Sequence, residues 1–257
     1  PGGLVIGIDR DSAALDAAQR ELSGLPVRLV QANFCDLPEV LKTLGIESVD
    51  GVVLDLGMSS DQLADASRGF SFDADGPLDL RFDTSAGEPA WRLLNRLSAD
   101  HLADLIYHFG EEKHSRKIAR RIVDRRREKP VRTARELADI LRRCVPRSRN
   151  DKIDPAKRTF QALRIAVNGE LKSLEIALRR IPQCLRPQAR IAIISFHSLE
   201  DRRVKEAFRD DPRYEPLSKK PIRASEEEIA ANPRARSAKL RVAARTTAAT
   251  ATTTQDP

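Results

Sequence analysis

The sequence predicts an α/β protein in which a parallel sheet is interrupted by an all-helical insertion. In residues 4–57, short aliphatic runs alternate with segments of helical periodicity, which is typical of parallel strands joined by helical crossovers. Residues 91–145 then read as successive helices without a strand signal between them. A strand pattern returns at 190–196, so the sheet is expected to draw on both sides of the insertion.

The alternating segments have the lengths of ordinary strands and helices. Strands are expected at 4–8, 27–31 and 49–57, where aliphatic and β-branched residues cluster. Helices are expected between them at 11–22 and 37–45, and the second ends at a glycine, a common residue just past a helix C-terminus.

The remaining elements follow from breaks and returns of these patterns. Residues 61–90 are rich in Asp, Gly and Pro, and irregular stretches of this length in compact proteins are often functional. One long helix is expected at about 157–180, ending before Pro182. We expect a last strand at the edge of the sheet at 238–244 and a disordered tail after residue 245.

Composition excludes several classes of protein. With 40% hydrophobic and 32% charged residues, the chain reads as soluble, and no apolar run approaches the roughly 20 residues that a membrane span needs. Cys35, Cys144 and Cys184 are scattered without metal-ligand spacing, which is typical of reduced thiols in a cytoplasmic protein and gives no metal site.

Charge is distributed unevenly along the chain. Residues 1–112 carry 8 Lys or Arg against 20 Asp or Glu, whereas residues 113–152 carry 16 against 5. A concentrated basic segment suits a polyanion such as nucleic acid. A solvated, Arg-rich helical face explains the same segment about equally well.

Polar residues follow three successive predicted strands: Asp9, then Asn33 and Phe34, then Asp55. Ligands of doubly wound sheets lie across the carboxyl ends of the strands. A carboxylate there can hold ribose hydroxyls, an aromatic residue can contact adenine, and a further carboxylate can stand where chemistry occurs. Each strand-end Asp can also be a simple helix cap. A dinucleotide and S-adenosylmethionine both fit this pattern.

Longer motifs separate these ligands, because together they resemble the bacterial small-subunit (16S) rRNA cytosine-N4 methyltransferase family. The resemblance runs from about Gly7 to Arg245. Its motifs are LDLGMSSDQL (54–63), RGFSF (68–72), GPLDLRFD (76–83), RTFQALRIAVNGEL (158–171), ISFHSLEDRRVK (194–205) and NPRARSAKLR (232–241).

The resemblance implies a class I (Rossmann-like) S-adenosylmethionine-dependent methyltransferase fold. It implies a methyltransferase domain at 1–84 and 157–245, a helical substrate-recognition insertion at 85–156, and a tail at 246–257. The family begins with a further strand and a glycine-rich loop that this chain lacks. We therefore expect an N-terminally truncated chain whose neighbouring strands expose apolar edges.

The implied reaction is methyl transfer from S-adenosylmethionine to the N4 amine of a cytidine in the decoding region of 16S rRNA. The implied partner is the small ribosomal subunit, and a homodimer stays open. The resemblance places Asp9 on the ribose, Phe34 near the adenine, and Asp55 and Gln62 along the cofactor cleft. Asp55 is also the first candidate to accept a hydrogen bond from the amine, with cofactor binding as an equal alternative.

Candidate contacts to RNA are more numerous, and each has a structural alternative. Arg68 and Arg81 can bind phosphate or brace the irregular loop, and His197 can contact the base or cap the next helix. Phe70 or Phe72 can stack on a flipped base, although a place in the core is the stronger interpretation. The complete set of RNA candidates is Ser59, Arg68, Arg81, Arg116, Arg120 and His197.

Two other functions stay open at this stage. The first is an adenine or small-molecule methyltransferase on the same fold, which is disfavoured because Asp55 lacks a following Pro-Pro-aromatic motif. The second is a non-catalytic RNA-binding fragment that uses the basic segment without a working cofactor site. Cofactor binding distinguishes this fragment from the enzyme.

Overall fold

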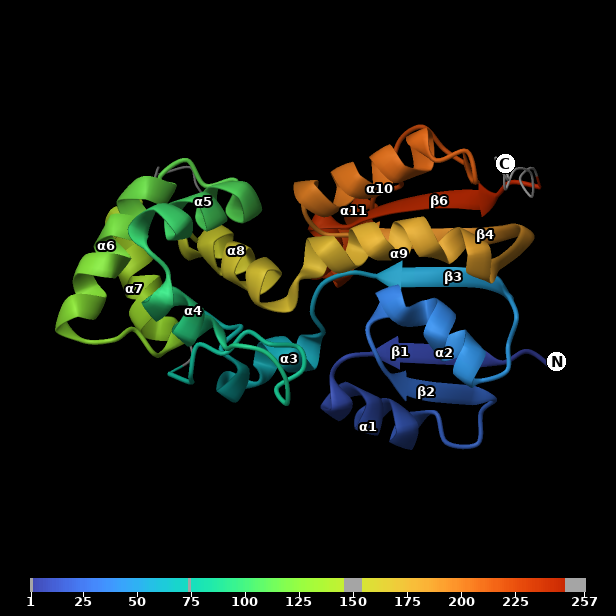
Figure 1. Cartoon of the computed structure of the whole chain (residues 1–257), viewed down its shortest axis with the longest axis horizontal. Helices are drawn as coiled ribbons and strands as arrows, with labels where there is room; N and C mark the ends of the chain where they lie inside the picture. Colours follow the sequence, from blue (N-terminus) through green and yellow to red (C-terminus); the bar gives the residue numbers. More distant parts are fainter. Residues whose placement is uncertain (1, 74, 146–153, 248–257) are drawn as a thin grey trace, which may run out of the picture. The chain divides into compact units, whose positions relative to one another are not determined.

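The structure is a computed structural model that describes residues 2–73, 75–145 and 154–247, and it confirms the α/β class (Figure 1). The chain forms two compact units, each built from two stretches of sequence. The first unit consists of Pro1–Gln31 and Met58–Glu170, and the second of Ala32–Gly57 and Leu171–Pro257. The domain boundaries expected from the sequence stay a prediction.

The first unit begins with a strand–helix–strand segment, blue in Figure 1. Strands β1 (Val5–Asp9) and β2 (Val27–Gln31) pair in parallel and are joined through helix α1 (Ser12–Glu21). None of the residues in these three elements is buried. Val5 of β1 is 60% exposed.

The rest of the first unit is helical, as the sequence predicts. Its helices are α3 (Ser60–Ala64), α4 (Ala90–Arg96), α5 (Ala99–Gly110), α6 (Ser115–Glu128), α7 (Ala134–Cys144) and α8 (Ala156–Asn168). Thr133 and Glu136 form a capping box at the start of α7, a pattern that can be read from the sequence.

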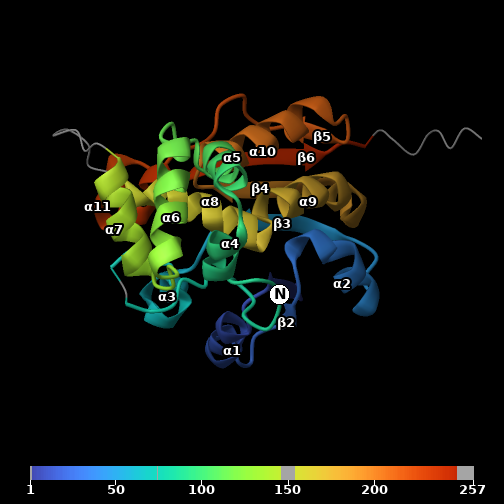
Figure 2. The ribbon, with the colours of Figure 1, turned by 60° about the vertical axis from the view of Figure 1, so that its left-hand side comes forward.

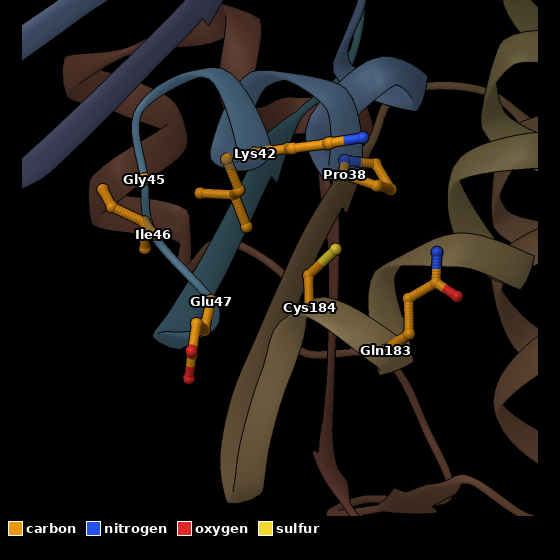
Figure 3. A pocket seen from close by; sticks show the side chains of 8 residues that line it. Pro38, Lys42, Gly45, Ile46, Glu47, Gln183 and Cys184 are labelled. Atoms are coloured by element: carbon orange, nitrogen blue, oxygen red, sulfur yellow. The ribbon is translucent and has the colours of Figure 1, made fainter.

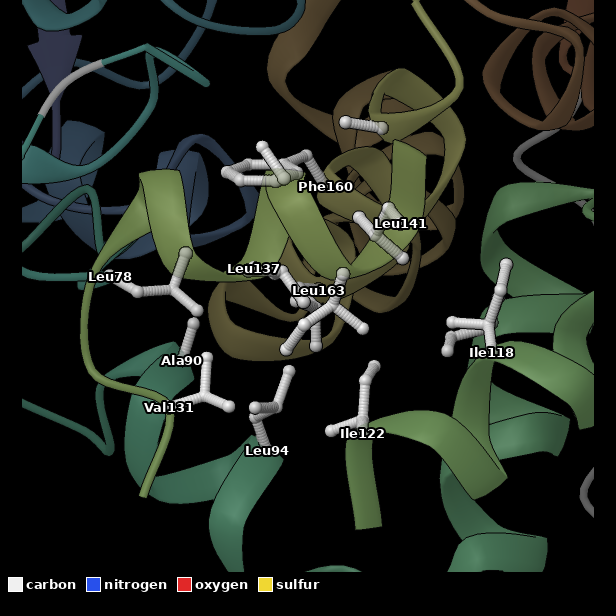
Figure 4. Packing of buried hydrophobic residues seen from close by; sticks show 14 of the residues in the cluster. Leu78, Ala90, Leu94, Ile118, Ile122, Val131, Leu137, Leu141, Phe160 and Leu163 are labelled. Atoms are coloured by element: carbon white, nitrogen blue, oxygen red, sulfur yellow. The ribbon is translucent and has the colours of Figure 1, made fainter. Parts of the chain in front are cut away.

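Apolar residues at helical spacing bury one face of each longer helix and form a single core (Figure 4). Leu94, Leu102, Ile118 and Leu141 are completely buried there. The core includes residues outside the expected insertion, such as Leu78.

The irregular segment is ordered by close packing rather than by helices or strands. Among its described residues, the helical elements are α3, a 3₁₀ turn at Ala66–Arg68 and the first residue of α4, Ala90. A Cβ on Gly76 would lie 1.7 Å from the carbonyl oxygen of Ala66, so only glycine fits where these loops cross. Phe70 is buried in the helical core and Phe72 packs against it, so both aromatic rings serve packing.

The single helix expected at 157–180 is wrong: the structure has two helices, α8 and α9 (Glu170–Cys184). They are separated by Gly169, whose φ of 61° is left-handed and ends α8. Pro182 lies inside α9, contrary to expectation. Proline cannot donate to the carbonyl of Leu178, which instead accepts a hydrogen bond of 2.7 Å from the Tyr214 hydroxyl.

The second unit contains a four-stranded sheet in the order β3 (Val49–Asp55), β4 (Leu185–Ser195), β6 (Lys239–Arg245) and β5 (Tyr214–Pro216). Strands β3 and β4 are parallel, and the other pairs are antiparallel. The helices of this unit are α2 (Leu37–Thr43), α9, α10 (Ser198–Asp210) and α11 (Glu226–Ala231).

The expectation that the last strand lies at the sheet edge is wrong, because β6 pairs with both β4 and β5. The edge strand β5 has three residues and contains Pro216, which blunts the edge. At the other edge, Val53 of β3 is 72% exposed. Of the predicted tail, residues 248–257 lie outside the described residues.

In the described part of the chain, no helix combines the length and apolarity required to cross a membrane. All three cysteines are free and buried. Burial raises the pKa of each thiol, which suits packing rather than reactivity.

Candidate functional site

Asp9 ends β1 in the first unit and remains accessible. Its Oδ1 accepts a hydrogen bond of 2.8 Å from the backbone N–H of Asp11, and the backbone N–H of Arg10 also stabilises the charged carboxylate. Partial desolvation raises the pKa of Asp9. Because Asp9 is exposed, its carboxylate can accept a further hydrogen bond from a hydroxyl group of a ligand.

Asp11, which sequence analysis did not single out, is the buried centre of this strand end. It caps α1, because Oδ1 accepts a hydrogen bond from the N–H of Ala13. Its Oδ2 accepts a hydrogen bond of 2.8 Å from Gln62 Nε2 and one of 3.0 Å from Arg68 Nη1. Asp11 thus joins β1 to the irregular segment of the same unit.

Gln62 points into this buried contact. In the capping box of α3, its Oε1 accepts from the N–H of Ser59, and its own N–H donates to Ser59 Oγ, both over 3.1 Å. Its Nε2 has two hydrogens, and the contact with Asp11 uses one. The cofactor role of Gln62 and the RNA role of Ser59 stay predictions.

Arg68 and Arg81 brace the loop in this structure. Arg68 is 9% exposed, and its Nη2 donates to the carbonyl oxygens of Arg81 and Phe82 over 2.9 and 2.8 Å. Arg81 forms a two-point contact with Asp79, with both distances 2.8 Å. An RNA contact by either arginine stays a prediction.

In the second unit, Asp55 ends β3 and lies beside Ile194 of β4 in the parallel register. Its side chain is accessible and has no hydrogen-bond partner among the described residues. Partial desolvation raises its pKa. Just beyond it, a Cβ on Gly57 would lie 3.5 Å from the Phe196 ring, so the ends of β3 and β4 are close together.

His197 caps α10, so the structure shows the capping alternative. Its Nδ1 accepts from the N–H of Glu200 over 3.4 Å, and Nε2 lies 3.0 Å from Glu200 Oε1. The second pair lacks hydrogen-bond geometry, which leaves Nε2 buried without a hydrogen bond in the described part of the chain. A contact between His197 and RNA stays a prediction.

Glu200, which is 2% exposed, holds the backbone after β4. Its Oε2 accepts from the N–H groups of Phe196 and His197 over 2.9 and 3.3 Å. Its spacing of three residues from the helix cap is a signal readable from sequence.

Phe34 begins a 3₁₀ turn (Phe34–Asp36) in the second unit and is half-buried. Asn33 fixes this turn, because Oδ1 accepts from the N–H of Cys35 and Nδ2 donates to Ser173 Oγ over 2.9 Å. The partly exposed ring is available for a flat ligand, and its adenine role stays a prediction.

Helix α6 carries the densest basic surface of the first unit and lies beside α7 (Figure 2). Ile118 and Ile122 face the core. Its exposed face carries Arg116, Lys117, Arg120 and Arg121, for which no ion pair occurs among the described residues. Such a face can bind a phosphate backbone.

A pocket of about 510 Å³ lies elsewhere, between α2 and the end of α9 (Figure 3). Its lining includes Lys42, Glu47 and Cys184. Glu47 precedes β3, whereas Asp55 ends it, and a seven-residue strand separates its ends by about 20 Å. This pocket is therefore remote from Asp55.

Comparisons with known proteins identify the family. The MraW methylase family model matches residues 2–246. Ribosomal RNA small subunit methyltransferase H from Rhodopirellula baltica is 54% identical over 246 residues, covering 94% of this chain and 76% of that relative. The Sorangium cellulosum protein of the same name is 50% identical, covering 95% and 78%. The chain therefore belongs to the MraW methylase family, whose members are methyltransferases with a Rossmann-like fold.

Proposed function

We propose that the protein methylates the N4 amine of a cytidine in the decoding region of 16S rRNA, using S-adenosylmethionine. Support for rRNA as the substrate comes from relatives named ribosomal RNA small subunit methyltransferase H at about half identity. The structural observation that carries the proposal is that β1 and β3 each end in an exposed aspartate, Asp9 and Asp55.

Each unit carries groups whose chemistry suits this cofactor. The exposed Asp9 carboxylate can accept hydrogen bonds from ribose hydroxyls, and the half-buried ring of Phe34 offers a surface for adenine. Gln62 retains one amide hydrogen for the ligand. Carboxylates also suit a cofactor that carries a positive sulfonium charge.

Asp55 is the proposed acid–base residue. When bound, S-adenosylmethionine supplies the electrophilic methyl group. Asp55 accepts one N–H of the cytosine amine, which returns electron density to a nitrogen whose lone pair is delocalised into the ring. Asp55 would take the proton that the amine loses when it gains the methyl group and the S–C bond of the sulfonium breaks, a role helped by its raised pKa.

The basic face of α6 would hold the RNA backbone while the target base leaves its stack. We place this reaction in the cytoplasm, on the small ribosomal subunit. A homodimer stays a prediction. The competing function, an RNA-binding fragment without catalysis, shares this basic surface and differs in not binding the cofactor.

Transfer of a labelled methyl group to 16S rRNA and to small ribosomal subunits tests the proposal. We expect N4-methylcytidine in the nuclease digest, and an Asp55→Asn variant about 100-fold slower, which is typical of losing an acid–base residue. Asp50→Asn removes an exposed carboxylate from the same strand and should match the wild type. Labelling of another nucleoside would refute the assigned target atom.

A further inference from the structure

A closed ring of hydrogen bonds surrounds the end of β1 in the first unit. Arg10 Nη1 donates to the backbone carbonyl of Asn168 over 2.8 Å, and Asn168 Oδ1 accepts from the N–H of Phe82 over 2.8 Å. The carbonyl of Phe82 accepts from Arg68, which also donates to Asp11. Asp11 follows Arg10 in the chain, so the ring closes.

The ring is shielded from water. Asp11, Arg68 and Asn168 are 5%, 9% and 5% exposed. An ion pair buried in this way is costly to disrupt, because removal of one charge leaves the other desolvated. The hydrogen bonds of the ring therefore join residues that are 14 to 158 positions apart in sequence.

The ring also holds a strained turn at residues 79–83. Leu80 has a φ of 63°, although it carries a side chain and is 1% exposed. Its carbonyl oxygen accepts a hydrogen bond of 2.7 Å from Asn168 Nδ2, and its N–H donates to the carbonyl oxygen of Arg68. Strain persists only where the surroundings fix it, and it often marks functional segments.

A hydrogen bond from Asp11 connects the ring to the carboxylate of Asp9. The backbone N–H that orients the Asp9 carboxylate belongs to Asp11, whose own carboxylate is held by Arg68 and Gln62. A shift of the 79–83 turn would move Arg68, then Asp11, and then the acceptor oxygen of Asp9. None of this requires Arg68 or Asn168 to touch a ligand.

We propose that Arg68 and Asn168 are positioning residues, which couple the strained 79–83 turn to the carboxylate that binds the cofactor ribose. This inference rests on the proposed function, because it assigns Asp9 to the ribose. It differs from simple structural support in one respect. Support alone would affect all ligands equally, whereas positioning of Asp9 affects the ribose hydroxyls selectively.

The test compares Arg68→Lys with Arg96→Lys. Lysine keeps the charge beside Asp11 but cannot also reach the two carbonyl oxygens of the turn. Arg96 belongs to the same unit and pairs with Glu88 at the surface. Binding of S-adenosylhomocysteine and of its 2′-deoxy analogue is measured calorimetrically, and amide hydrogen exchange is followed at Asp11 and Phe82.

We expect Arg68→Lys to weaken the binding of S-adenosylhomocysteine about tenfold, which corresponds to the loss of roughly one charge-assisted hydrogen bond. The affinity for the 2′-deoxy analogue should fall less than about twofold. The ratio of the two affinities therefore becomes smaller in the variant. Exchange at Asp11 and Phe82 should accelerate together, and Arg96→Lys should change neither measurement. Asn168→Asp, which keeps the acceptor for Phe82 but loses the donor to Leu80, should reproduce this pattern if Arg68→Lys fails to fold.

Equal weakening of both ligands, or unchanged exchange at Asp11, would overturn the inference. If the wild type binds neither ligand, the proposed function fails on its own. The exchange rates then decide the inference: joint acceleration supports the coupling, and independent or unchanged rates contradict it.

Discussion

Two regions of the first unit are stabilised in different ways. The helical core buries its large aliphatic residues completely, as Leu102 and Ile118 show. Within β1, α1 and β2 themselves no residue is buried, and Asp11, between β1 and α1, is a buried polar residue. This segment is held instead by strand pairing and by polar contacts centred on Asp11. The region that carries Asp9, the carboxylate proposed to bind the cofactor, therefore has less apolar packing than the helical core.

This difference separates stability from function within one unit. Apolar burial contributes in proportion to the area removed from water, so the helical core dominates global stability. Regions with little apolar burial open locally at lower free energy. We expect the strand–helix–strand segment to respond to changes in its polar contacts and the core to respond to changes in volume.

The largest effect is expected from a matched pair of leucines. Leu102→Ala should lower the free energy of unfolding by about 2–5 kcal/mol, because it removes buried methyl groups and leaves a cavity. Leu25→Ala, at a residue 57% exposed, should change it by less than about 0.5 kcal/mol. Urea unfolding measures both, and comparable losses would contradict the contrast.

An intermediate loss of stability is expected from a substitution of Asp11, the residue on which the polar contacts converge. Asp11→Ala removes the cap of α1 and leaves the Arg68 guanidinium buried without its carboxylate, which should cost about 2–4 kcal/mol. The loss should appear as faster amide exchange in α1, while the core helices α5 and α6 stay protected. Uniform acceleration across the unit would show that the two regions unfold as one.

The basic face of α6 allows a test through salt dependence. Substituting both Arg116 and Arg120 with alanine should reduce the slope of log K against log salt for single-stranded rRNA by about 1.4, or 0.7 per lost phosphate contact. Arg127→Ala is the control, because Arg127 lies on the same helix but pairs with Asp124. An unchanged slope in the double variant would indicate a merely solvated face.

The smallest effect is a difference in titration between the two regions. Desolvation raises the pKa of Asp9. Burial also acts to raise the pKa of Glu136 in the helical region, but hydrogen bonds from Arg132, Lys129 and Thr133 outweigh it and lower that pKa. Carboxyl NMR titration should place Asp9 above the ordinary Asp value of about 3.9 and Glu136 below the ordinary Glu value of about 4.3.

Asp9 and Glu136 also change the free energy of unfolding with pH in opposite directions. Glu136 contributes stability above its unfolded pKa, and this contribution is lost as pH falls through the folded value. Folded Asp9 holds its proton more tightly than the unfolded chain, so its contribution declines as pH rises from the unfolded value through the raised one. A cofactor that requires ionised Asp9 should therefore bind less well as pH falls through that raised pKa. pKa shifts of the same sign at Asp9 and Glu136 would contradict this difference between the two regions.

Local patterns predicted the elements whose causes are local. The strands ending at Asp9, Gln31 and Asp55 follow from aliphatic runs, and the α7 cap follows from Thr133 and Glu136. The break at Gly169 was missed because the apolar pattern continues across it, and only the left-handed backbone separates α8 from α9.

The candidate site was predictable only in part. Strand-end carboxylates can be located from sequence, and the spacing of His197 and Glu200 indicates a capping box. The contact between Asp11 and Arg68 joins residues 57 positions apart, and no local pattern pairs them. Likewise, three residues containing Pro216 gave no strand signal, because β5 is defined by pairing with β6.

The central claim is that the weakly packed strand end binds S-adenosylmethionine through Asp9. Calorimetric titration of S-adenosylmethionine into this chain tests it most directly, with Asp9→Ala and, as a control for lost charge in the same unit, Asp16→Ala. The account predicts binding by the wild type and by Asp16→Ala, and a loss of at least about tenfold in Asp9→Ala. Absence of binding by the folded wild-type chain, or equal binding by all three proteins, would contradict it.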